Sequence, residues 1–259
     1  MIAAKKKFFA LNDDVKRQYQ GPAGTLLGYI PFDKERYNPN TYEVHEGFLM
    51  LSEDEDNLPY SQIPSLLPAA AKAFPAKAFP AFRDLSSNLM SALSVALGQG
   101  KDYLARMHQE FFAKKGYSCL RVNHFPPMEI LPPPNSVRFG AHKDVSTFTI
   151  LMTGDKGGLQ ICNRAGAWMD VPPNKLLVIA GQFLHFTSHE KFIAPVHRVM
   201  IPDNADRDIS RFSIIFFICP DAHLPYRPAC IEEPEPCTWK DYYSSFLSDY
   251  LTKNYQKKE

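Results

Sequence analysis

The feature that most constrains the fold of this chain is a succession of short β-type segments between residues 117 and 219. Each is rich in Val, Ile, Phe and Thr, and Gly, Pro or Asn separates neighbouring segments at intervals of roughly ten residues. This spacing favours a sandwich or barrel over βαβ units. The expected strands are Tyr117–Phe125, Val137–His142, Thr147–Thr153, Gly158–Cys162, Ala167–Val171, Leu176–Ala180, Phe183–Thr187, Val196–Ile201 and Arg211–Cys219.

Helical patterns precede the β region. Apolar residues recur at spacings of three and four from Phe82 to Leu97, which predicts an amphipathic helix, and a second helix is expected over Asp102–Lys114. A tandem copy, Ala71–Pro75 followed by Ala76–Pro80, lies just before them. Because proline removes a helical hydrogen bond and clashes with the preceding turn, we expect a surface connection here and no continuous helix.

Shorter helical signals lie near both ends of the chain. Asn12 is suited to cap a short helix that ends near Tyr19. Thr238 is suited to cap a terminal helix that reaches Tyr255 and carries aromatic residues on one face. We therefore expect helices on both flanks of the β region.

Charge and cysteine content exclude several classes of protein. The 259 residues include 29 Lys and Arg against 28 Asp and Glu, so no basic surplus indicates a nucleic-acid partner. No apolar run approaches the ~18 residues of a membrane helix, and the first residues lack the apolar stretch of a signal peptide. The five cysteines are odd in number and include no Cys-x-x-Cys pair. We expect a soluble, cytoplasmic protein with free thiols.

Three residues have the chemistry of a metal site. His142 and Asp144 form a His-x-Asp triplet at the end of one expected strand, and His197 lies at the start of another. Two imidazoles and one carboxylate are the ligand set that holds non-haem Fe(II) and leaves positions open for other ligands. The triplet alone is a weak signal, and the structural alternatives are a satisfied polar pair and a core histidine.

Arg211 and Ser213 lie on one face of the last expected strand, because side chains two residues apart in a strand point the same way. A 2-oxo acid that chelates such an iron through one end requires a buried cation for a second, distal carboxylate. An arginine fork with a neighbouring hydroxyl supplies charge-assisted hydrogen bonds of this kind.

Together these motifs resemble those of the 2-oxoglutarate- and Fe(II)-dependent dioxygenases, the family that includes flavonol synthases, gibberellin oxidases and isopenicillin N synthase. The matching stretches are Asn123–Pro127, Ala141–Leu151, Gly157–Gln160, the His197 and Arg211 motifs, Phe8–Leu11, and Gly28 with Tyr29. The resemblance implies a mainly β fold with a double-stranded β-helix (jelly roll) core and helices on both flanks. It also implies Fe(II) held by His142, Asp144 and His197, and 2-oxoglutarate held by Arg211 and Ser213.

The resemblance further implies an enzyme that oxidises a small organic substrate by hydroxylation, desaturation or ring closure. O2 would be the oxidant, 2-oxoglutarate would yield succinate and CO2, and ascorbate is a candidate reductant. Asn123 is assigned to the cosubstrate site, and Arg121 and Phe217 to the substrate. Arg121 suits a carboxylate or phenolate on the substrate, unless it pairs with a core Glu or Asp, and Phe217 is otherwise plain core.

The sequence departs from the family at one position of the cosubstrate site. Phe125 stands where relatives carry a tyrosine hydroxyl, and strand alternation places the neighbouring His124 on the opposite face. Two alternatives therefore stay open: an Fe(II)-dependent oxidase that uses the same triad without 2-oxoglutarate, and a non-catalytic jelly-roll binding module. The triplet His108–Glu110 lies in an expected helix, where its side chains diverge, and is not expected to bind metal.

The spacing of these motifs favours a single domain, because residues far apart in sequence must meet inside one barrel. We expect a helical and irregular region over 1–115, the jelly roll over 116–221, and a tail with a helix over 222–259. Relatives usually carry another strand and helix before the landmark that here begins at Phe8. We therefore expect an exposed sheet edge, or a partner that covers it.

Overall fold

In the computed structural model, the described residues are 7–32, 34–37, 41–51, 69–113, 116–128, 134–203, 209–226 and 237–255. For residues 69–77 and 249–255 the description covers the backbone only. Within these ranges, no helix has both the length and the apolar character needed to cross a membrane.

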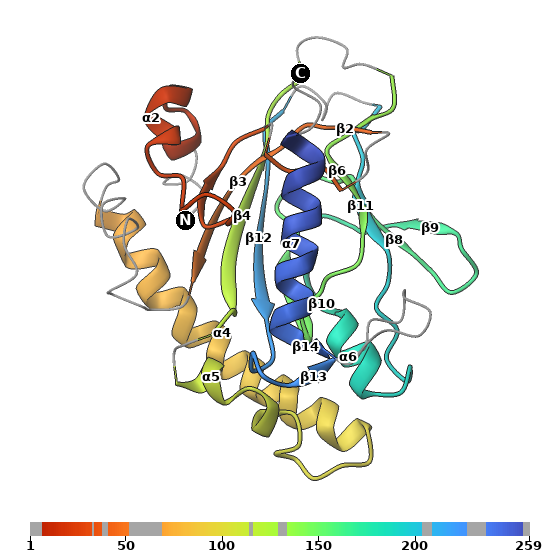
Figure 1. Ribbon diagram of the computed structural model, residues 1–259. Helices are drawn as coiled ribbons and strands as arrows, with labels where there is room; N and C mark the ends of the chain where they lie inside the picture. The colour runs from red at the N-terminus through yellow and green to blue at the C-terminus, as the bar shows by residue number, and fades with distance from the viewer. Residues whose placement is uncertain are drawn as a thin grey trace.

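Two β-sheets form the centre of the molecule (Figure 1), with the strand orders β1-β3-β4-β12-β7-β10 and β6-β11-β8-β9. The strands of the larger sheet are β1 (Gly28–Ile30), β3 (Glu46–Leu51), β4 (Cys119–Phe125), β7 (Phe148–Met152), β10 (Leu176–Ala180) and β12 (Arg211–Ile218). Those of the smaller sheet are β6 (Phe139–His142), β8 (Leu159–Cys162), β9 (Trp168–Asp170) and β11 (His197–Val199). All pairings within both sheets are antiparallel.

One hydrophobic cluster joins the two sheets face to face. Its buried members come from β4, β7, β10 and β12 of the larger sheet and from β6, β8 and β11 of the smaller one: Phe125, Phe139, Leu151, Leu159, Ile179, Val199 and Ile215. Inward-facing apolar residues that alternate with outward-facing ones produce this layer. The expected fold class, a mainly β jelly roll with flanking helices, is confirmed.

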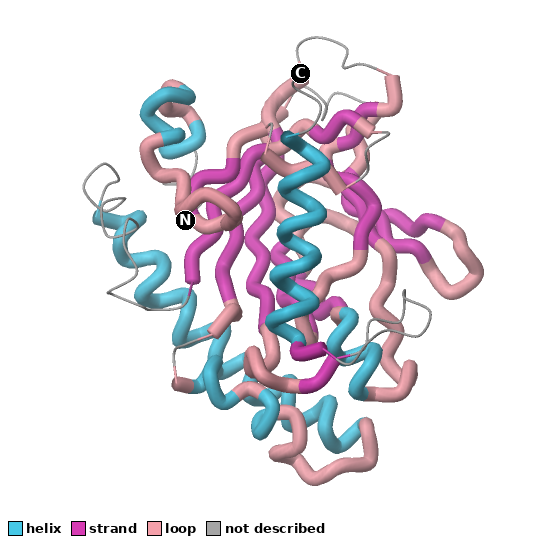
Figure 2. Tube along the Cα trace, viewed as in Figure 1, coloured by secondary structure: helices cyan, strands magenta, loops and turns pink. Residues whose placement is uncertain are grey.

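The outer face of the larger sheet is covered by α4 (Ala69–Ala96), the short helix α5 (Gln109–Phe112) and the turn η2 (Ala105–Met107). Phe82 of α4 stacks on Phe216 of β12 at 4.9 Å between ring centroids, and Phe79 meets the same ring edge-on. In Figure 2 the strands occupy the centre and most helices lie outside them, while α7 (Trp239–Tyr255) crosses in front.

The helical expectations for residues 71–114 need correction. Pro75 and Pro80 both lie inside the continuous helix α4, where we expected a surface connection. Burial of Phe79 and Phe82 against the sheet offsets the cost of each proline, about 3 kcal/mol. The helix expected over Asp102–Lys114 is reduced to η2 and the single turn α5.

Two further expectations of secondary structure are wrong. The segment Phe183–Thr187 belongs to the helix α6 (Gln182–Thr187), not to a strand. Its aromatic residues suggested a strand, but Phe183 and Leu184 are buried on one side of a helix instead. The first 115 residues are also not merely helical and irregular, because β1 and β3 extend the larger sheet beyond β4.

The terminal helices agree with expectation. Helix α2 (Asp13–Arg17) follows Asn12, although the Asn12 side chain makes no capping hydrogen bond. Thr238 caps α7: its Oγ1 accepts a hydrogen bond from the Asp241 backbone N–H, and Asp241 Oδ2 accepts one from the Thr238 N–H, both 3.2 Å. This reciprocal pair is a capping box. The strand pairs β13 (Pro225–Tyr226) with β14 (Cys237–Thr238), and β2 (Tyr42–Glu43) with β5 (Ser136–Val137), complete the described elements.

The two edges of the larger sheet differ. At β1 the chain covers its own edge, because Tyr29 N–H donates to the Tyr19 carbonyl (2.9 Å) and Gly21 N–H to the Leu27 carbonyl (2.8 Å). At β10, Leu176 and Val178 are about half exposed. The cover over β1 counts against the expected exposed edge at the strand nearest the N-terminal landmark.

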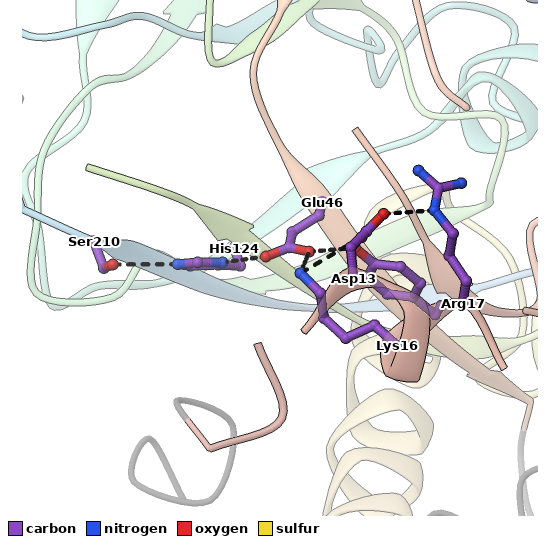
Figure 3. A network of polar contacts seen from close by, with 7 residues as sticks. Asp13, Lys16, Arg17, Glu46, His124 and Ser210 are labelled. Atoms are coloured by element: carbon purple, nitrogen blue, oxygen red, sulfur yellow. Dashed lines mark hydrogen bonds and ion pairs between the residues drawn. The ribbon is translucent and has the colours of Figure 1, made fainter. Parts of the chain in front are cut away.

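A polar network lies on the outer face of the larger sheet (Figure 3). Glu46 at its centre accepts hydrogen bonds from Lys16 (2.7 Å) and Tyr29 (2.5 Å) and pairs with His124 Nδ1 (2.7 Å), whose Nε2 contacts Ser210. Burial raises the pKa of Glu46, but the bonds from His124, Lys16 and Tyr29 lower it overall. His124 thus points away from the inner layer, as strand alternation predicts.

Candidate active site

Strands β6 and β11 bring the three expected metal ligands together. His142 and His197 are register partners, and Asp144 follows directly after β6. One nitrogen or oxygen atom from each of the three lies within 4.8 Å of the others. Asp144 Oδ1 is 3.5 Å from His142 Nε2 and 3.7 Å from His197 Nε2. Three ligand atoms therefore surround one point.

The hydrogen bonds of both histidines fix the nitrogen that faces this point. His142 Nδ1 contacts the Gly140 carbonyl (2.8 Å), and His197 Nδ1 contacts the Pro195 carbonyl (3.3 Å). Because a carbonyl oxygen only accepts, each Nδ1 carries the proton and each Nε2 keeps a free lone pair. Such backbone contacts are typical of metal-binding histidines.

The charge states of the site also suit a divalent cation. Burial raises the pKa of Asp144, but His197, His142 and the Thr149 hydroxyl outweigh it and hold that pKa at about 2. Burial, aided by the charge of His142, lowers the pKa of His197 to about 4. At neutral pH the carboxylate is ionised and the His197 imidazole is neutral, as coordination requires. The residues present therefore fit Fe(II).

Two residues that support the ligands were missed by sequence reasoning. The Thr149 hydroxyl donates to Asp144 Oδ2 (2.6 Å), which leaves Oδ1 directed at the histidines. The Tyr37 ring stacks on the His142 imidazole at 4.6 Å between centroids. Thr149 could have been found as a hydroxyl on the strand after the His-x-Asp triplet. No sequence pattern indicates Tyr37, because it lies in a loop far from His142 in the sequence.

Arg211 and Ser213 lie on the inner face of β12, opposite Phe125 and Asn123 of β4. Arg211 is 1% exposed, its Nε donates to the Lys156 carbonyl (3.2 Å), and its Nη1 has no hydrogen-bond partner within the described residues. Burial, together with the charge of Arg138, lowers the pKa of Arg211 to about 9, so it remains charged at neutral pH. A buried guanidinium with an unused donor fits the carboxylate of a dicarboxylic ligand.

Phe125 changes the environment of this guanidinium. The Arg211 Cζ lies 4.9 Å from the centre of the fully buried Phe125 ring, so the arginine rests on an aromatic face. Where relatives would offer a tyrosine hydroxyl, this chain offers a cation–π contact. The Phe125 position thus orients Arg211 but donates nothing to a carboxylate.

Arg121 has an acidic partner. Its Nη1 donates to Glu35 Oε1 (2.7 Å), its Nη2 contacts Glu35 Oε2, and its Nε donates to Asn123 Oδ1 (2.6 Å). Burial raises the pKa of Glu35, but the Arg121 charge and the His45 hydrogen bond bring it to about 2. The alternative that we left open, pairing with a core acid, is therefore what the structure shows. Sequence could not reveal Glu35, which lies in a distant loop.

A single pocket contains the candidate metal ligands and the Arg211 site. Its walls also include Phe217, as expected, and Asn123 and Arg121. Four residues of α7 close one side: Trp239, Tyr243, Phe246 and Leu247. The aromatic face of this helix was visible in the sequence, but its position over the pocket was not. The roles of Phe217 and Asn123 toward ligands stay predictions.

The remaining histidine motif is structural. His108 is fully buried, with Nδ1 at 2.7 Å from the Leu104 carbonyl and Nε2 at 2.8 Å from the Thr147 hydroxyl. Burial lowers its pKa to about 4. His108 thus uses both nitrogens within the fold, and among the described residues only the His142 group has the geometry of a metal site.

Comparison with known proteins agrees with this geometry. Residues 116–220 match the model of the 2OG-Fe(II) oxygenase superfamily. Gibberellin 2-beta-dioxygenase 3 of Arabidopsis thaliana is 28% identical over 97% of this chain and 76% of its own length. A full-length Neurospora crassa protein, solved with alpha-KG and thymine, superposes with a TM-score of 0.77 at 23% identity, over 95% of this chain and 81% of that one. JOX2, solved with 2OG, Fe and JA, gives 0.74 at 21% identity, over 96% and 76%.

Proposed function

Because the chain belongs to the 2-oxoglutarate- and Fe(II)-dependent oxygenase family, we propose that it oxidises a small organic molecule in the pocket between the two sheets. Of the alternatives, an oxidase that dispenses with 2-oxoglutarate is not favoured. The observation that carries the proposal is the combination, in one pocket, of the His142, Asp144 and His197 ligand atoms with the unused Arg211 donor.

In this proposal His142, Asp144 and His197 hold the iron, and Arg211 with Ser213 holds the distal carboxylate of 2-oxoglutarate. When bound, Fe(II) and 2-oxoglutarate would supply the activation of O2, with succinate and CO2 as the products of the cosubstrate and two oxidising equivalents left for the substrate. The chain itself contributes orientation: Thr149 fixes the Asp144 carboxylate, and the Gly140 and Pro195 carbonyls fix the imidazoles.

The residues that line the pocket support a small-molecule substrate. Apart from the metal and Arg211 sites, most lining residues are apolar or aromatic, which is typical of sites that bind organic ligands. Similar proteins are named for a gibberellin or were solved with thymine or JA, all of them small molecules. A reducing, cytoplasmic location is supported by the free thiols of Cys119, Cys162, Cys219 and Cys237.

The proposal is tested with anaerobic protein, Fe(II) and 2-oxoglutarate. We expect the visible charge-transfer band of the iron chelate, and succinate release once O2 and a substrate are added. Asp144→Ala should abolish the band by removing bound iron, whereas Arg198→Met should retain it, because Arg198 packs on Trp168 away from the pocket. Bound iron without a band would overturn the proposal and favour the oxidase that uses no 2-oxoglutarate.

A further inference from the structure

Helix α7 crosses in front of the strands (Figure 1). Its pocket-lining residues Trp239, Tyr243, Phe246 and Leu247 recur at spacings of three and four, so they share one helical face. The fully buried Trp239 donates its indole N–H to the Val145 carbonyl (3.2 Å), directly beside the metal-site carboxylate. This bond holds the first turn of α7 against the metal-site loop.

Tyr243 is the residue of this wall that carries a hydroxyl, and it lines the pocket. Its ring stacks on Trp239 at 5.0 Å and 10°, and meets Tyr117 edge-on at 5.4 Å. The same pocket is lined by Cys119 and Cys219, and burial followed by these two thiols raises the pKa of the Tyr243 hydroxyl. No group in the described part of the chain forms a hydrogen bond with this hydroxyl. The donor is therefore available to a ligand.

The surroundings of this hydroxyl are uncharged. Burial raises the pKa of Cys119 to about 12 and the pKa values of Cys219 and Tyr243 well above their usual range, so all three are neutral at neutral pH. Of the three cations that line the pocket, Arg121 is neutralised by Glu35, Arg211 is assigned to the cosubstrate carboxylate, and Lys143 is exposed to solvent. A substrate carboxylate here would lose its hydration without gaining an unpaired cation, which is costly. An uncharged oxygen that accepts one phenolic hydrogen bond avoids that cost.

We propose that Tyr243 donates a hydrogen bond to an uncharged oxygen, such as that of a ketone, lactone or alcohol, on an otherwise apolar ring skeleton. This contact selects the substrate and orients it between α7 and the metal ligands. The inference rests on the proposed function, since it assigns a substrate class to the same pocket. It differs from the sequence-based expectation that Arg121 receives a substrate carboxylate or phenolate.

The test uses the fluorescence of Trp239, which contacts Tyr243 in the pocket. A Trp168→Phe background leaves Trp239 as the only tryptophan, because the sequence has two. The anaerobic protein with Fe(II) and 2-oxoglutarate is titrated with 1-tetralone, with tetralin, which lacks the oxygen, and with tetralin-1-carboxylate. We expect 1-tetralone to bind three- to tenfold more tightly than tetralin, roughly the value of one hydrogen bond, and the carboxylate to bind more weakly than the ketone.

Tyr243→Phe should reduce the ketone-to-tetralin ratio to near one while keeping the ring stack. The matched control Tyr242→Phe should leave the ratio unchanged, because Tyr242 packs against Tyr226 and does not line the pocket. An unchanged ratio in Tyr243→Phe, or tightest binding of the carboxylate, would overturn the inference. The charge-transfer band of the iron chelate separates the two proposals. If the band is normal but Tyr243→Phe leaves the ketone-to-tetralin affinity ratio unchanged, only the assignment of Tyr243 is refuted. If the band is missing but Tyr243→Phe lowers that ratio, only the use of 2-oxoglutarate as cosubstrate is refuted.

Discussion

Replacement of Arg211 by methionine should separate cosubstrate binding from both iron binding and folding. Arg211 is buried, its Nη1 has no partner within the described residues, and it lies near a second buried cation, Arg138. In the ligand-free protein, only a hydrogen bond to the Lys156 carbonyl and a cation–π contact with Phe125 are described as offsetting the burial of this charge beside Arg138. Against the distal carboxylate of 2-oxoglutarate it would gain two charge-assisted hydrogen bonds, each worth about 1.5–3 kcal/mol.

The magnitude follows from what Arg211→Met leaves behind. A carboxylate that enters the same buried position without the guanidinium is uncompensated, which costs about 3–5 kcal/mol. That cost corresponds to a rise of about two to three and a half orders of magnitude in the Kd of 2-oxoglutarate. The free energy of unfolding without ligand should not fall by more than about 1 kcal/mol, because methionine fills much of the space and removes a desolvated charge.

The assay is anaerobic titration of the Fe(II)-loaded protein with 2-oxoglutarate, followed by the charge-transfer band, with iron content and chemical denaturation measured in parallel. Ser213→Ala should weaken binding by only about tenfold, since it removes one hydrogen bond from an uncharged donor to the carboxylate, about 1.5 kcal/mol. Equal losses of iron and 2-oxoglutarate, or a large loss of stability, would show that Arg211 supports the fold and does not bind the cosubstrate.

Two further perturbations test residues that support the site. Thr149→Val should lower the affinity for Fe(II) or Co(II) by about 10- to 100-fold, since it frees the Asp144 carboxylate to rotate; metal titration that gives the wild-type affinity would contradict this role. Glu35→Gln should cost about 3–5 kcal/mol of unfolding free energy at pH 7 by leaving Arg121 buried without its anion. Because the folded-state pKa of Glu35 is about 2, below its ordinary 4.5, the stabilisation is complete above about pH 4.5 and declines as pH falls toward 2. Denaturation curves at pH 7 and pH 3 should thus show a smaller difference at pH 3, whereas a constant difference would refute the ion-pair account.

The strands of the jelly roll were predictable because their signal is local. Cys119–Phe125, Leu176–Ala180 and Arg211–Ile218 each combine β-branched or aromatic residues with flanking breakers, and their observed bounds differ from expectation by at most two residues. The metal ligands were predictable for a related reason: His142 and Asp144 are two positions apart, and only His197 requires knowledge of the barrel.

The errors arise where distant packing overrides local preference. Phe183 favours a strand by composition, but its N–H bonds to the Ser146 carbonyl at the metal-site loop and helix α6 begins there. Pro80 should end a helix by itself, yet the neighbouring Phe79 and Phe82 are buried on β12 and hold α4 together. Glu35 reaches Arg121 across 86 positions, and no sequence period reports such a pair.

Strands β4 and β12 carry packed side chains on both faces, and this limits where residues can be inserted or deleted. On β4, Arg121 and Asn123 face the pocket, whereas His124 faces Glu46 in the outer network. Insertion or deletion of one residue within either strand would exchange the two sets and place network residues in the pocket. Divergence of substrate preference can therefore proceed through substitution along these strands, while gains and losses of residues are confined to the connections between them.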